Sequence, residues 1–139
     1  MQFHVQTPGI EKTTIAAHIQ ARGLHGLLLC SPENVYYTSG LPVLPGSGNP
    51  ILYALSNQLP SFVYISAHGK LTLLCWIGAT LGFTFDADDV RSFFNRESAL
   101  DELQEFLQAT LPGDARVGIE QNCPFYVSGL EGPCVYAWG

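Results

Sequence analysis

The chain has 139 residues, of which 47% are hydrophobic and 13% charged, and its formal net charge is −6. That length allows one domain with a substantial core, and the composition excludes an intrinsically disordered chain. The six Lys and Arg residues are scattered, so no basic stripe is available for nucleic acid. In soluble domains about a quarter of the residues are usually charged, whereas here only 13% are. We therefore expect a second domain or subunit to cover part of this surface.

The first predicted elements are a helix and a buried strand. The helix should end near Arg22, because Ile15 and Ile19 lie one turn apart and Gly23 can supply a left-handed stop. The nearly continuous apolar run Leu24–Cys30 follows at once. Such a run directly after a helix stop predicts a short strand buried on both faces.

A second, shorter helix should begin at the sequence Ser-Pro-Glu-Asn. Ser31 can cap this helix, and Pro32 fits its first position without losing a hydrogen bond. Tyr36 and Tyr37 would lie on the helix, and Gly40 should end it.

The middle of the chain is predicted to contain a loop followed by strands. Leu41–Pro50 is rich in Pro and Gly, and its Gly-Ser-Gly lacks the Lys-Ser/Thr of a phosphate-binding loop. Ile51–Leu55 is compatible with a strand, although its periodicity is ambiguous. Ser61–Ser66 and Leu71–Trp76 indicate a hairpin that turns through Ala67–Lys70.

An acidic segment separates the hairpin from the next helix. Gly78–Asp89 should be irregular, and its three Asp residues lack the spacing of a calcium-binding EF-hand loop. We interpret it as a solvated acidic turn. The helix that follows should be capped by Ser98 with Asp101 as its partner, and Pro112-Gly113 should end it. Its predicted apolar face consists of Leu100, Leu103, Leu107 and Leu111.

The last predicted elements are the strand Arg116–Glu120 and a helix from Pro124 to Leu130. Helices therefore alternate with short apolar strands, and one pair of strands forms a hairpin. This order predicts an α/β domain with a mixed β-sheet flanked by helices.

Candidate catalytic residues are isolated from one another. The four His residues are far apart, and no Ser occupies a G-x-S-x-G turn. Glu120 ends a strand, where α/β active sites often form, but without a second carboxylate nearby in the sequence it should cap or pair locally. Trp76, which closes a strand before Gly78, is either a core residue or an interface anchor at the sheet edge.

The N-terminus and the lack of a membrane-spanning run suggest a cytoplasmic chain, in which cysteines are expected to be reduced. Four widely spaced Cys residues contain no C-x-x-C pair, so they do not indicate a zinc site. Cys30 and Cys75 lie in apolar runs, and we expect buried reduced thiols rather than the alternative, a disulfide. The first ten residues lack a signal-peptide pattern, and no apolar run approaches the ~20 residues that span a bilayer.

One stretch carries a family resemblance. Residues Ala21–Gly40 resemble the opening of the creatinase/prolidase N-terminal domain: a helix ending in Gly-Leu, an apolar strand, Ser-Pro-Glu-Asn, Tyr-Tyr and a Thr-Ser-Gly turn. The predicted hairpin, long helix and strand Arg116–Glu120 occur in the family's order, so the resemblance reaches about Leu130. Glu131–Gly139 has no recognised counterpart, and its Val-Tyr-Ala-Trp would be unusual on a finished surface.

This resemblance implies a fold and a role. The fold would be a three-layer α/β/α structure of the ribonuclease-H-like type, with residues 1–139 forming one non-catalytic domain. In the family, a C-terminal "pita-bread" domain cleaves bonds before proline and holds two divalent metals, such as manganese, with two Asp, one His and two Glu. We expect that domain to be absent here, which leaves no catalytic residue and no metal ligand in this chain.

The resemblance also implies partners and a surface. Such domains commonly form homodimers and line the approach to a neighbouring active site, which would make Tyr37, Leu41 and Trp76 rim or interface residues. The partners would be the C-terminal catalytic domain and a second copy, with no nucleic acid and no membrane. Two alternatives stay open: a stand-alone binding or dimerisation module, and the N-terminal domain of a creatinase-like hydrolase that is not a peptidase.

Overall fold

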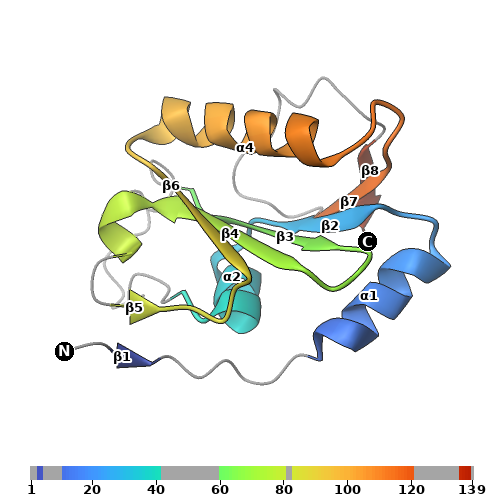
Figure 1. Ribbon diagram of the computed structural model, residues 1–139, viewed down its shortest axis with the longest axis horizontal. Helices are drawn as coiled ribbons and strands as arrows, with labels where there is room; N and C mark the ends of the chain where they lie inside the picture. The colour runs from blue at the N-terminus through green and yellow to red at the C-terminus, as the bar shows by residue number, and fades with distance from the viewer. Residues whose placement is uncertain (1–2, 5–10, 42–59, 81–82, 121–134, 139) are drawn as a thin grey trace.

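The computed structural model describes residues 3–4, 11–41, 60–80, 83–120 and 135–138 (Figure 1). Its helices are α1 (Lys12–Ala21), α2 (Pro32–Ser39), the 3-10 helix η1 (Ile77–Thr80) and α4 (Arg96–Thr110). Its strands are β1 (Phe3–His4), β2 (Gly26–Leu29), β3 (Phe62–Ser66), β4 (Leu71–Trp76), β5 (Phe83–Thr84), β6 (Asp89–Phe93), β7 (Val117–Glu120) and β8 (Val135–Trp138).

A six-stranded mixed sheet forms the centre of the fold, as the alternation of helices and strands predicted. The strand order is β6-β4-β3-β2-β7-β8, and β1 pairs with β5 in a separate parallel ladder. β3 is antiparallel to both of its neighbours, whereas every other neighbouring pair in the six-stranded sheet is parallel. Five strands therefore run in one direction, and β3 runs in the other.

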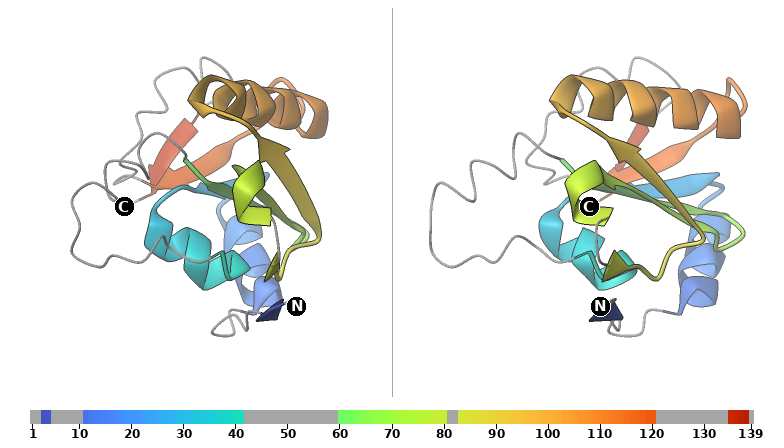
Figure 2. Two further views of the ribbon diagram at one scale, coloured as in Figure 1. Left: turned by 90° about the vertical axis from the view of Figure 1, so that its left-hand side faces the viewer. Right: turned by 60° about the vertical axis from the view of Figure 1, so that its left-hand side comes forward.

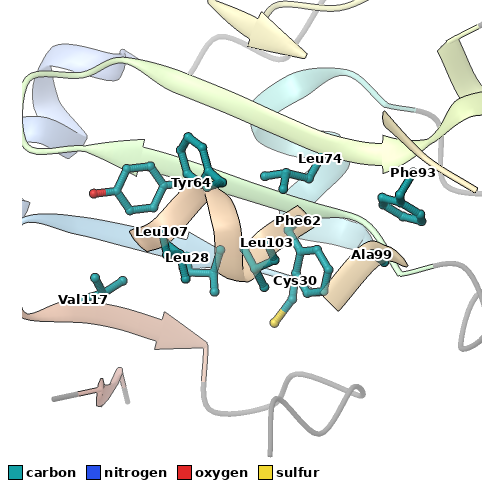
Figure 3. Packing of buried hydrophobic residues seen from close by; sticks show 11 residues of the cluster. Leu28, Cys30, Phe62, Tyr64, Leu74, Phe93, Ala99, Leu103, Leu107 and Val117 are labelled. Atoms are coloured by element: carbon teal, nitrogen blue, oxygen red, sulfur yellow. The ribbon is translucent and has the colours of Figure 1, made fainter. Parts of the chain in front are cut away.

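Helices cover both faces of this sheet and give the expected three layers (Figures 1 and 2). On one face α4 packs over a buried cluster in which Phe62, Tyr64 and Leu74 lie beneath Leu103 and Leu107 of the helix (Figure 3). On the other face α1 and α2 cover a second buried cluster. Its strand residues alternate along each strand with those of the first cluster, because successive side chains of a strand point to opposite faces of the sheet. Because both faces of the sheet are covered by hydrophobic clusters, these strands are nearly continuous apolar runs in the sequence.

The predicted ends of the first two helices are confirmed. Gly23 follows α1 at φ 65°, and Gly40 follows α2 at φ 75°, both in the left-handed region that glycine adopts without strain. At the start of α2 the Ser31 hydroxyl accepts a hydrogen bond from the Asn34 backbone N–H. Pro32 occupies the first helical turn, as its lack of an N–H allows.

The predicted hairpin is confirmed as β3 and β4. These strands pair antiparallel, with Val63 opposite Leu73. Gly69 has φ 82°, and the Ser66 hydroxyl accepts hydrogen bonds from the backbone N–H groups of His68 and Lys70. A side-chain acceptor and a left-handed glycine together close the short turn.

The long helix is confirmed, but its predicted cap is wrong. α4 begins after Asn95, whose side chain accepts from the Ser98 N–H, while the Ser98 hydroxyl accepts from the Asn95 N–H. Ser98 is therefore the third residue of the helix rather than its N-cap. Leu100, predicted on the apolar face, is 39% exposed, and that face instead contains Ala99, Leu103, Phe106 and Leu107.

The acidic segment contains more structure than the sequence indicated. The prediction that residues 78–89 are irregular missed η1, β5 and the start of β6, a charged strand at the edge of the sheet. Asp86 is half exposed and lies 3.3 Å from the Lys12 ammonium. Asp88 accepts a hydrogen bond from the Leu71 N–H at 2.7 Å, so it fixes the segment beside β4. These two carboxylates therefore have partners elsewhere in the chain, which the interpretation as a solvated turn did not include.

Several other expectations can be compared with the structure. The strand at residues 116–120 is confirmed as β7, and β8 adds parallel to it within the segment that had no family counterpart. Cys75 is buried and free, but Cys30 is disulfide-bonded, which corrects the expectation of reduced thiols for that residue. The predicted strand at 51–55, the helix at 124–130 and residues 42–50 of the predicted loop lie outside the described residues.

Candidate interaction surface at the carboxyl edge of the sheet

The carboxyl ends of the parallel strands define the edge where a functional site is expected. β2, β4, β6 and β7 run in the same direction, so they all end at one edge of the sheet. In open α/β sheets ligands usually bind at this edge. Two different groups of side chains occupy it, a hydrogen-bonded carboxylate at β2 and β7 and exposed apolar residues at β4 and β6.

The carboxylate is that of Glu120, the last residue of β7. One of its oxygens accepts hydrogen bonds from the backbone N–H groups of Cys30, at 2.6 Å, and Ser31, at 2.7 Å. The other oxygen accepts from the Ser31 hydroxyl at 2.7 Å and from the Asn34 side-chain amide. Since β2 and β7 are parallel neighbours, the end of one strand comes to lie beside the helix start that follows the other.

These contacts determine the charge state of Glu120. Partial burial opposes ionisation, but the hydrogen bonds from Ser31, Cys30 and Asn34 outweigh it and hold the pKa of the Glu120 carboxyl below its usual 4.5. A carboxylate offers about four acceptor positions, and four donors use them here. Glu120 is therefore an ionised carboxylate that joins the end of β7 to the start of α2, and its partners lie far away in the sequence rather than locally as predicted.

The other half of the edge is apolar and exposed. Trp76 ends β4 with 40% of its surface exposed, and the next residue, Ile77, is 38% exposed. Trp76 is paired in register with Phe93, the last residue of β6, and Phe94 follows with 73% exposure. A Cβ built on Gly78 would overlap the Trp76 ring, so only glycine permits this placement of the ring.

The three residues predicted to form a rim occupy different environments. Tyr37 lies on α2 and is 44% exposed, and Trp76 is exposed at the end of β4. Leu41 is 7% exposed and belongs to the buried cluster on the α1 and α2 face, so little of its surface is available to a partner. The structure thus leaves Tyr37 and Trp76 as the exposed members of this set.

Sequence reasoning missed some of the exposed apolar residues. It did not distinguish Phe93, which is 2% exposed, from Phe94, which points outward with 73% of its surface exposed. The signal was present, because two adjacent residues at a strand end cannot both face the core. It also missed the contact of Glu120 with Ser31 and Asn34, which lie 86–89 positions away in the sequence.

The described residues offer neither a metal site nor an activated cysteine thiol. No group of three or more His, Cys, Asp or Glu side chains there could hold a metal ion. The His25 Nδ1 atom accepts a hydrogen bond from the Arg116 N–H. Burial raises the pKa of the Cys75 thiol to about 11, which keeps it protonated and poorly nucleophilic. In the described part of the chain, we find no helix long and apolar enough to cross a membrane.

Comparison with models of known families assigns the chain to one of them. Residues 13–131 match the model of the creatinase/prolidase N-terminal domain, which is most of the chain. The chain belongs to the creatinase/prolidase N-terminal domain family. No curated protein matches it.

Several solved structures share the fold of this chain. An Xaa-Pro aminopeptidase structure from Streptococcus pyogenes is 19% identical with a TM-score of 0.62, over 91% of this chain and 88% of that chain. The N-terminal domain of a metallopeptidase from Corynebacterium diphtheriae is 17% identical with a TM-score of 0.52, over 91% and 95%. The prolidase from Pyrococcus horikoshii is 21% identical with a TM-score of 0.53, over 84% of this chain and 27% of that chain. This chain therefore spans about a quarter of that prolidase.

Proposed function

We propose that this chain is the non-catalytic N-terminal accessory domain of a metal-dependent Xaa-Pro peptidase, an aminopeptidase or dipeptidase specific for proline. The observation that carries the proposal is the family match over residues 13–131. The prolidase that this chain matches over only 27% of its length is consistent with a parent that has a further domain. The engagement of Glu120 as a helix cap is consistent with the absence of a catalytic role in this domain.

The chemistry of the parent would reside in a C-terminal pita-bread domain. Two divalent metal ions, such as manganese, would be held there by two Asp, one His and two Glu. Carboxylate and imidazole ligands suit such ions, and a pair of metals can activate water and polarise the peptide carbonyl. In this proposal no residue of the present chain is a metal ligand.

The part of the present chain would be oligomerisation and shaping of the entrance to the active site. Trp76 and Tyr37 are the rim residues we propose, because each exposes a large aromatic side chain of the kind that anchors interfaces. Trp76 has exposed apolar residues beside it, whereas Tyr37 adjoins Tyr36 on α2. We propose a homodimeric parent, with no nucleic acid or membrane partner.

Two other functions use the same fold. A stand-alone binding or dimerisation module would explain the exposed aromatic residues without any catalytic partner. A creatinase-like hydrolase would have a pita-bread domain but a different substrate. Neither is favoured by a particular contact in the described residues.

The coding sequence downstream of residue 139 tests the proposal and separates the three functions. We expect it to continue into a pita-bread sequence that contains the two Asp, one His and two Glu. A stop codon shortly after residue 139 would overturn the proposal in favour of the stand-alone module. A pita-bread sequence without these ligands would overturn it in favour of a creatinase-like enzyme.

A further inference from the structure

The strand β6 forms an outer edge of the six-stranded sheet. Among the strands that the structure describes, β6 pairs with β4 on one side and with none on the other. The left view of Figure 2 shows it on the outside of the molecule, next to α4. Such an edge presents backbone N–H and C=O groups that can pair with a further strand.

The backbone groups that point away from β4 can be identified. In the β3–β4 hairpin the Ser66 N–H donates to the Lys70 carbonyl, so the backbone groups of Thr72 and Leu74 point toward β3 and those of Leu71, Leu73 and Cys75 point toward β6. Because Leu73 is in register with Val90 in a parallel pair, its hydrogen-bond partners are Asp89 and Arg91, whose backbone groups therefore point toward β4. Since backbone groups alternate in direction along a strand, the N–H and C=O groups of Val90 and Ser92 point toward the open edge.

This alternation restricts how β6 could pair with β6 of a second copy. In an antiparallel pair about a two-fold axis, the residues that exchange hydrogen bonds must be the ones that point outward. The axis then passes through Val90, Arg91 or Ser92. An axis at Arg91 places two guanidinium groups opposite each other, and an axis at Ser92 places Arg91 opposite Phe93.

The axis through Val90 gives complementary charges. It places Asp89 of each copy directly opposite Arg91 of the other, on the same face of the sheet, which gives two attractive cross-strand pairs. On the opposite face it brings together the two Val90 side chains, each 39% exposed in the single chain. A strand with an acid and a base two residues apart is complementary to itself in this arrangement, which favours a second copy over an unrelated partner.

We propose that β6 is a self-association edge that pairs antiparallel with β6 of a second copy about an axis at Val90. The inference rests on the proposed function in that it assigns a surface to the expected homodimer. A strand of five residues makes a small interface, so the association of the chain alone is weak, with a Kd of roughly tens to hundreds of micromolar. The net charge of −6 on each copy also opposes association at low ionic strength.

The test is analytical ultracentrifugation of the 139-residue chain from about 10 μM to 1 mM, a range that brackets the expected Kd, at about 0.15 M salt. Asp89→Lys places like charges opposite each other at both pairs, and Arg91→Glu does the same with carboxylates. Asp114→Lys makes the same charge change as the first variant at an exposed position in the turn after α4. Circular dichroism melts confirm that each variant is folded, since Arg91 also pairs with Asp89 and Glu102 of its own chain.

We expect Asp89→Lys to weaken self-association at least about tenfold relative to Asp114→Lys. An equimolar mixture of Asp89→Lys and Arg91→Glu should associate about as tightly as the unaltered chain, because both cross-strand pairs are then attractive. If Asp89→Lys and Asp114→Lys weaken association equally, the β6 edge is not the interface, although the proposed homodimer can still form elsewhere. A chain that is monomeric at every concentration overturns the β6 edge, while the accessory role is still judged by the downstream coding sequence.

Discussion

The Glu120 carboxylate accepts a hydrogen bond from the Ser31 hydroxyl at 2.7 Å and a second from the Ser31 backbone N–H, also at 2.7 Å. This contact joins the end of β7 to the N-terminus of α2. A negative charge at that position also interacts favourably with the helix dipole. The start of α2 is thereby fixed to the central sheet, and with it the helix that presents Tyr37.

Replacing Glu120 by Gln should destabilise the fold by about 2 kcal/mol. The substitution removes the charge and turns an amide NH₂ toward backbone and side-chain donors, so that at least one part-buried donor loses its acceptor. Urea denaturation followed by circular dichroism measures the free energy of unfolding. Glu105→Gln, an identical change at an exposed position of α4, should alter it by less than about 0.5 kcal/mol. Equal effects of the two variants would show that the cap contributes nothing specific.

The contribution of Glu120 should depend on pH. Its folded-state pKa is lowered from 4.5, so the native state binds the proton less readily than the unfolded state does. The stabilisation is therefore complete above about pH 5.5 and is lost as the pH falls through 4.5 and then through the lower folded-state pKa. The difference in unfolding free energy between the unaltered chain and Glu120→Gln, measured at several pH values, should shrink on acidification. A difference that grows toward low pH would contradict the assignment.

Gly26→Ala should destabilise the protein by about 2 kcal/mol. A Cβ at this position of β2 would overlap the Tyr64 ring, which is buried and whose hydroxyl donates to the His25 carbonyl. Thermal melts of Gly26→Ala and Gly113→Ala make a matched pair, because a Cβ at Gly113 would meet nothing within 4 Å. If both variants have the same melting temperature as the unaltered chain, the Tyr64 ring does not lie against Gly26 in solution.

Asn95→Ala should cost about 1 kcal/mol, because it removes the side-chain acceptor that caps α4. Asp101→Ala tests the competing assignment, in which Ser98 is the cap and Asp101 its partner. We expect Asp101→Ala to change the unfolding free energy by less than about 0.5 kcal/mol. The reverse order of the two effects in chemical denaturation would restore the cap that the sequence suggested.

Elements with local signals could be predicted from the sequence. The ends of α1 and α2 depend on Gly23 and Gly40, and the β3–β4 turn depends on Gly69; each acts within a few residues of its own position. The resemblance in residues 21–40 covered the same region and indicated the correct family. Such features are predictable because the backbone conformation they require is specific to glycine.

Features that depend on distant contacts could not be predicted. Glu120 could be recognised as a cap or pair, but its partners are nearly 90 positions away and are brought near it by the parallel pairing of β2 and β7. β6 was missed because an edge strand is half exposed and carries charges, which also mark an irregular turn. The cap of α4 was misplaced because Asn95 and Ser98 both suit that role, and the geometry of the helix start decides between them.

In the proposed function this domain has no peptidase activity of its own. The most direct measurement is hydrolysis of Xaa-Pro dipeptides and longer Xaa-Pro peptides by the purified 139-residue chain with Mn²⁺ in excess. We predict no turnover above that of buffer with Mn²⁺ alone. Turnover that co-purifies with the chain and is abolished by a metal chelator would contradict the claim.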